Sequence, residues 1–122
     1  MRVIIAGGRD FGSTEEHREL FTQTIQVAGA GITEVVCGKA RGADSLGELW
    51  ALENGVPVAE FPADWNSLGK RAGYVRNSQM AEYADALLAF WDGQSRGTKH
   101  MIDQATAKGL PVQVVHYSGE AK

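Results

Sequence analysis

Five apolar runs rich in β-branched residues alternate with stretches of helical periodicity along the chain. The runs span residues 2–6, 33–37, 57–61, 85–91 and 111–116, and the helical stretches lie near 14–29, 43–54, 69–83 and 97–108. Strands that alternate with helices form a parallel sheet, because each helix returns the chain to the edge where the next strand begins. The pattern therefore predicts one α/β domain over residues 1–117, with three layers and a five-stranded, mainly parallel sheet in the order 3-2-1-4-5, followed by a frayed tail over residues 118–122.

Two local patterns refine this prediction. Ser13 is followed three residues later by Glu16, which is the spacing of a capping box at the start of a helix. Residues 61–68 show no periodic pattern, and a long irregular loop in a small domain is typical of a functional segment or a lid. Trp65 lies in this polar loop, so it is the tryptophan best placed to stack on a base.

The composition limits the class of protein. With 122 residues, 43% of them hydrophobic and 22% charged, the chain has the make-up of one ordinary globular domain. No apolar run approaches the ~20 residues of a membrane span, and the first run is too short for a secretory signal. The single cysteine, Cys37, cannot form an internal disulfide, so we expect a cytoplasmic protein without membrane association.

Charge is distributed unevenly along the chain. The net charge of −3 argues against a broad nucleic-acid surface, for which a strongly basic domain is expected. The acidic residues fall mostly within the predicted helices, whereas most cations follow predicted strands. If the sheet is parallel, these cations gather at one edge and favour a compact anionic ligand. They are Arg9, Lys39, Arg41, Lys70, Arg71, Arg76, Arg96 and Lys99.

The strongest candidate site follows the second predicted strand, where a glycine-rich turn with two cations leads into a helix. The N-terminus of a helix has unpaired N–H groups and a positive dipole end, so it attracts anions. Asp44 can cap this helix or accept hydrogen bonds from ribose hydroxyls. The turn comprises Gly38, Lys39, Ala40, Arg41, Gly42, Ala43 and Asp44.

Two further glycine-bearing segments flank the predicted reversal of strand order, where doubly wound sheets bind ligands. The segment of residues 7–12 has the glycine spacing of a phosphate loop. Ser13 and Thr14 stand where such a loop carries its Lys-Ser/Thr pair, which argues against a GTPase or ATPase of that type. A G-x-G-x-x-G fingerprint is also absent. The candidate binding residues in these segments are Gly7, Gly8, Arg9, Asp10, Phe11, Gly93, Gly97 and Thr98.

The predicted helix at 69–83 supplies the remaining candidates. Lys70, Gly73 and Asn77 share one helical face, and Arg76 lies beside it, so this face can contact an anion. The three histidines are scattered and share no motif with Cys37, so we expect neither a metal site nor a resident cofactor.

Together these segments resemble the YspA/cpYpsA-related SLOG family, part of a Rossmann-like group with the DprA/Smf proteins and the LOG phosphoribohydrolases. The resemblance covers residues 2–116 and includes the segments at 7–11, 38–44, 69–80 and 97–98. It implies a bacterial or phage protein with a Rossmann-like sheet that binds nucleotide-derived ligands. It does not imply catalysis, because Met101 stands where LOG enzymes carry the catalytic glutamate of P-G-G-x-G-T-x-x-E.

Three functions follow as hypotheses. In the first, the protein is a sensor or sequestering protein for a phosphorylated, nucleotide-derived molecule. Backbone amides, Arg9, Lys39, Arg41 and Thr98 hold phosphate, Asp10, Asp44 or Asn77 holds ribose, and Trp65 or Phe11 covers the base. The second is an N-glycoside hydrolase or transferase acting on nucleoside monophosphates, with Asp44 and Asp92 as candidate catalytic carboxylates. The third, single-stranded DNA binding by analogy with DprA, is disfavoured by the pI near 5.6. A homodimer is an open alternative to a monomer.

Overall fold

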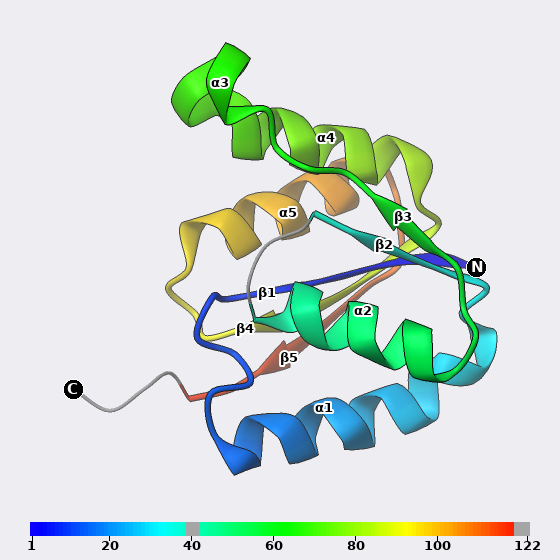
Figure 1. Cartoon of the computed structure of the whole chain (residues 1–122). Helices are drawn as coiled ribbons and strands as arrows, with labels where there is room; N and C mark the ends of the chain where they lie inside the picture. Colours follow the sequence, from blue (N-terminus) through cyan, green and yellow to red (C-terminus); the bar gives the residue numbers. More distant parts are fainter. Residues whose placement is uncertain (39–41, 119–122) are drawn as a thin grey trace.

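The computed structural model describes residues 1–38 and 42–118. Within them the sheet has five strands in the order β3-β2-β1-β4-β5, and every neighbouring pair is parallel (Figure 1). In the central ladders Ile4 of β1 pairs with Val36 of β2 on one side and Leu87 of β4 on the other. The predicted strand order is confirmed. The strands are β1 Arg2–Gly7, β2 Glu34–Cys37, β3 Val58–Glu60, β4 Ala86–Trp91 and β5 Val112–His116.

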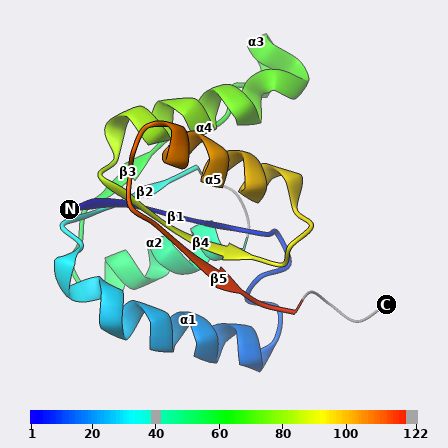
Figure 2. The ribbon, with the colours of Figure 1, turned by 180° about the vertical axis from the view of Figure 1, so that it is seen from behind.

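Helices cover both faces of this sheet. Helices α1 (Glu15–Ala28) and α2 (Ala43–Glu53) lie on one face, and α4 (Ala72–Tyr83) and α5 (Arg96–Ala107) lie on the other (Figures 1 and 2). The result is the three-layer, Rossmann-like architecture that the alternating pattern predicts. Among the described residues, none of the helices is both long enough and apolar enough to cross a bilayer.

Successive residues of β1 point into two separate apolar clusters, because side chains alternate across a strand. Ile5 lies in the cluster under α1 and α2, together with Phe21 and Phe90. Ile4 lies in the cluster under α4 and α5, together with Met101. This double burial explains why the β1 sequence is apolar at nearly every position.

Two local predictions differ from the structure. The helix predicted over 69–83 is found as the 3-10 turn η2 (Gly69–Arg71) followed directly by α4. A short helix that was not predicted, α3 (Trp65–Leu68), precedes it and ends at Gly69, whose φ is +57°. The segment at 61–68 is thus partly helical. The N-cap of α1 is Thr14, whose side chain accepts from the His17 backbone N–H, so Ser13 forms no capping box.

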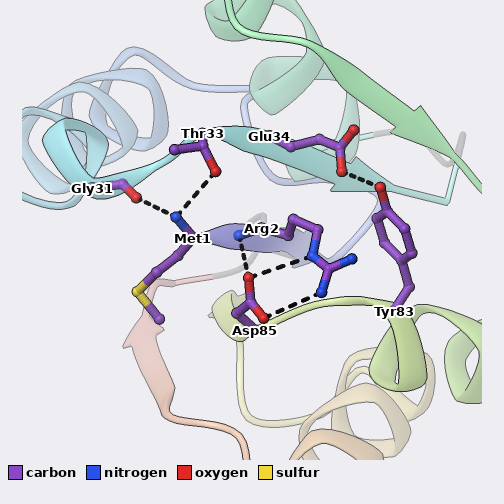
Figure 3. A network of polar contacts seen from close by, with 7 residues as sticks. All are labelled: Met1, Arg2, Gly31, Thr33, Glu34, Tyr83 and Asp85. Atoms are coloured by element: carbon purple, nitrogen blue, oxygen red, sulfur yellow. Dashed lines mark hydrogen bonds and ion pairs between the residues drawn. The ribbon is translucent and has the colours of Figure 1, made fainter.

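The amino ends of the strands are joined by a polar network (Figure 3). The backbone N–H of Arg2 donates to Asp85 Oδ2 at 2.8 Å, and Nε of the same arginine donates to that oxygen at 3.4 Å. The Arg2 guanidinium also lies 4.6 Å from the Tyr83 ring centre, and the Tyr83 hydroxyl donates to Glu34. This network ties β1, β2 and β4 together at the edge opposite the candidate site.

Candidate functional site

An open cleft of about 1060 Å³ lies at the carboxyl edge of the sheet. The carboxyl ends of β1 and β4 lie at the same end of the molecule as α3 (Figure 1), and residues that follow these strands line the cleft together with residues of α3, η2 and α4. Segments that are far apart in the sequence therefore meet at one edge. The predicted binding residues that line it are Gly7, Gly8, Arg9, Asp10, Gly38, Asp44, Trp65, Lys70, Arg76, Asn77, Gly97 and Thr98.

Other predicted residues are placed differently. Phe11 is only 2% exposed and stacks on Phe90 with ring centres 4.5 Å apart, so it belongs to the core and cannot cover a base. Gly42 and Gly93 do not line the cleft. The predictions for Lys39, Ala40 and Arg41, and for the tail at 119–122, lie outside the described residues.

Gly42 brings two loops into contact instead of facing a ligand. Its φ is +78°, in the left-handed region, and a Cβ at this position would lie 2.1 Å from the Gly8 carbonyl oxygen. Only glycine permits both the backbone conformation and the close approach. Gly42 thereby sets the position of the first glycine-bearing loop relative to the start of α2.

The end of β2 is held from both sides at Gly38. The Gly38 N–H donates to Asp44 Oδ2 at 2.9 Å, and Arg76 Nη1 donates to the Gly38 carbonyl oxygen at 2.6 Å. Burial lowers the pKa of Arg76, and the Asp44 charge opposes that shift. Asp44 therefore does not provide the N-cap of α2, a position that Gly42 occupies without a side-chain bond.

A second set of contacts joins α4 to the first turn of α5. The amide nitrogen of Asn77 donates to the Gly97 carbonyl oxygen at 3.3 Å and lies 3.1 Å from His100 Nδ1. Burial lowers the pKa of His100. The amide oxygen of Asn77 accepts from Arg76 Nε at 3.0 Å. Both the oxygen and the nitrogen of the Asn77 amide therefore already have partners within the protein.

The loop before α5 is shaped by a carboxylate. Asp92 Oδ1 accepts from the backbone N–H groups of Gln94 and Ser95, each at 2.8 Å. Ser95 is the N-cap of α5, and its hydroxyl lies 3.1 Å from the Thr98 hydroxyl. The negative carboxylate of Asp92 and the positive dipole end of α5 therefore lie next to each other at the cleft.

Asp10 is oriented by a residue from the far end of the chain. The Tyr117 hydroxyl donates to Asp10 Oδ1 at 2.7 Å, across 107 positions of sequence. Burial, followed by the contact with Asp10, raises the pKa of Tyr117 well above its ordinary value. The next residue is also held, since the Ser118 carbonyl oxygen lies 2.8 Å from His17 Nε2. The predicted fray therefore does not begin at Ser118.

Charges in the cleft are more mixed than the sequence suggests. Among the described residues that line it, Arg9, Lys70 and Arg76 are cationic and Asp10, Asp44 and Asp92 are anionic. Of the other predicted cations, Lys99 pairs with Asp103 at 3.0 Å along α5, and neither Arg71 nor Arg96 lines the cleft. Within residues 1–38 and 42–118, no three His, Cys, Asp or Glu side chains are grouped to hold a metal ion.

The family model described as the YspA, cpYpsA-related SLOG family matches residues 1–67, which is more than half of the chain. The chain belongs to this family. This SLOG chain is also 36% identical over 117 residues to the Gene 61 protein of Mycobacterium phage D29, covering 91% of this chain and 93% of that protein. No solved structure matches it.

The family match covers only part of the cleft in this SLOG protein. Residues 1–67 contain β1 to the start of α3, with the loops that carry Arg9, Asp10 and Asp44. The α4 and α5 sides lie beyond the match. Met101, at the position that the resemblance assigns to the LOG glutamate, is 1% exposed and lines the cleft as an apolar side chain.

Sequence reasoning missed three contributors to the SLOG site. Tyr74 lines the cleft and Tyr117 orients Asp10, but isolated tyrosines give no motif signal. Ser95 was detectable, because serine three residues before Thr98 fits an N-cap at the start of a helix.

Proposed function

We propose that this SLOG protein binds a nucleotide or a nucleotide-derived phosphorylated molecule in the cleft, as a sensor or sequestering protein. The observation that carries the proposal is that residues at the ends of β1, β2 and β4 and in the first turn of α5 line one cleft at one sheet edge. Ligands of doubly wound sheets bind at this edge, beside the reversal of strand order between β1 and β4.

Phosphate fits the side of the cleft formed by α5. Gly97 and Thr98 lie in the first turn of this helix, where backbone N–H groups and the helix dipole favour an anion. Arg9 and Lys70 line the same cleft and are exposed, so their charges can reach a ligand. Arg76 adds a third positive charge to the cleft lining, although its guanidinium already donates to the Gly38 carbonyl oxygen.

Ribose fits the carboxylates of the cleft. Asp10, Asp44 and Asp92 present acceptor oxygens, and hydroxyl donors pair well with carboxylates. Asn77 is the weaker candidate, because its amide already joins Arg76, Gly97 and His100.

The test is a thermal-shift titration with nucleoside monophosphates, cyclic nucleotides and ADP-ribose. We expect at least one of these probes to raise the Tm, because a ligand that binds only the folded state stabilises it. Arg9→Ala should weaken the effect. Lys108→Ala, a cation at the other end of α5, should not change it. Absence of any shift across the panel would contradict the proposal.

A second candidate function is hydrolysis or transfer at the N-glycosidic bond of a nucleoside monophosphate. It is favoured by the three carboxylates in the cleft, because this chemistry needs a carboxylate near the anomeric carbon. Chromatography of the released base from each monophosphate tests it. Release that disappears in Asp44→Asn or Asp92→Asn would establish the enzyme, and a Tm shift without release would leave binding alone.

A further inference from the structure

Two aromatic side chains at the cleft are unusually exposed. Trp65 is 55% exposed and Tyr74 is 49% exposed, and both line the cleft. Among the described residues, every other phenylalanine, tyrosine and tryptophan is buried or half-buried. Exposing a large aromatic ring forfeits apolar burial, so two such rings in one cleft indicate that something flat covers them.

Trp65 is held in place by its surroundings. Asp64 caps α3 by accepting from the Ser67 N–H at 3.2 Å, and the tip of the indole lies beside Gly73 of α4. A Cβ at position 73 would lie 3.5 Å from the tip of the Trp65 ring and 3.7 Å from Arg76 Nη2. These are ordinary van der Waals distances, so the tip of the indole lies close to the first turn of α4 and leaves room for a small side chain at position 73.

Tyr74 connects this aromatic surface to the opposite side of the cleft. Its ring centre lies 4.4 Å from that of His100, and His100 contacts Asn77, which in turn donates to the Gly97 carbonyl. Tyr74 and the first turn of α5 are thus linked by a short series of contacts, and Trp65 lines the same cleft. One molecule can touch both if it has an anionic end and a flat end.

We infer that Trp65 and Tyr74 form a base-binding shelf on α3 and α4, so that the ligand is a nucleotide with an intact base whose phosphate points toward α5. This inference rests on the proposed function and adds the orientation of the ligand and its specificity. Stacking has little dependence on hydrogen-bond pattern and grows with ring area, so the shelf favours purines over pyrimidines without choosing one purine.

The experiment compares the four common nucleoside monophosphates with ribose 5-phosphate, which has the same phosphate and sugar but no base. Calorimetric titration should show purine monophosphates binding most tightly and ribose 5-phosphate most weakly. Trp65→Ala and Tyr74→Ala should each weaken AMP binding about tenfold, the loss expected for one stacking partner, and leave ribose 5-phosphate unchanged. Leu52→Ala, an exposed apolar residue of α2 outside the cleft, is the matched control.

Tryptophan fluorescence reports directly whether the ligand contacts the Trp65 ring. AMP should quench the wild-type protein and Trp50→Phe, which removes a tryptophan packed against the core on α2, but not Trp65→Phe. If AMP and ribose 5-phosphate bind equally, or if both shelf variants bind AMP like the wild type, the shelf is wrong while the proposed function stands. If none of the five probes binds, the shelf inference fails, and the proposed function fails with it only when cyclic nucleotides and ADP-ribose also leave the Tm unchanged.

Discussion

Arg76 Nη1 donates to the carbonyl oxygen of Gly38 at 2.6 Å, across 38 positions of sequence. A Cβ at Gly38 would lie 2.5 Å from that same nitrogen, so the guanidinium occupies the space that a side chain would need. A cation predicted as a ligand contact is therefore also a structural contact that holds the end of β2 at the cleft.

Replacing Arg76 with methionine keeps most of the stem and removes the hydrogen bond. Hydrogen bonds that involve a charged group contribute about 1.5–3 kcal/mol, so we expect Arg76→Met to lower the free energy of unfolding by about 2 kcal/mol. Urea denaturation measures this loss. Arg71→Met, at an exposed position just before α4, should change stability by less than about 0.5 kcal/mol. Equal midpoints for the two variants would contradict the structural role.

Alanine substitutions at Gly42 and Gly55 compare the stability cost of a positive φ alone with the cost of a positive φ and a close contact together. Both have positive φ values, +78° and +66°, but a Cβ at Gly55 meets nothing within 4 Å, whereas one at Gly42 meets the Gly8 carbonyl oxygen. We expect Gly55→Ala to cost about 1 kcal/mol for the left-handed backbone alone. Gly42→Ala should cost clearly more. Thermal or urea unfolding of the two variants gives the comparison, and similar losses would show that the two loops are not in tight contact.

Tyr117→Phe should destabilise the fold by about 1 kcal/mol, because it removes the hydrogen bond to Asp10 and retains the ring. The ring packs 4.7 Å from Phe11 and remains in the core of the variant. Tyr74→Phe, at an exposed position, is the control and should leave stability unchanged. The hydrogen bond with Glu34 raises the pKa of Tyr83, and burial raises the pKa of Tyr117. A spectrophotometric titration should therefore show that Tyr117→Phe loses one of the tyrosines that resist ionisation in the wild type.

Asp85 should make folding stability dependent on acid pH. Hydrogen bonds from the Arg2 backbone and then from its side chain lower the pKa of Asp85 (Figure 3). A carboxyl group whose pKa is lowered by folding contributes stability above its ordinary pKa and loses it as the pH falls through the lowered value. The stability difference between the wild type and Asp85→Asn should therefore be constant near neutral pH and shrink below about pH 4.

The control for this pH dependence is Asp103→Asn, which removes the exposed pair with Lys99 within α5. Pairs of this kind contribute about 0.3–0.5 kcal/mol, so this variant should differ little from the wild type at any pH. Urea denaturation at several pH values checks both variants, and a pH-independent effect of Asp85→Asn would refute the assignment.

The sequence pattern was informative about the sheet because its central strands β1, β2 and β4 are buried on both faces. Strand β1 is apolar at nearly every position, so the alternation of strands and helices and the parallel sheet follow from local patterns. The strand order is one that doubly wound sheets adopt. It was less informative at 65–71, where the short helix α3 was not predicted and a positive φ at Gly69 separates it from the turn that leads into α4. Periodicity does not report the sign of φ at a glycine.

For the candidate site, the sequence alone determined which loops meet, because parallel strands end at a common edge and the glycine-bearing segments follow those ends. Only the tertiary structure decided what each side chain does there. Phe11 turns into the core, Arg76 binds Gly38, and Tyr117 reaches Asp10, and each outcome depends on a neighbour distant in the chain. Side-chain direction and partner are set by packing between elements, and a local pattern carries no record of that packing.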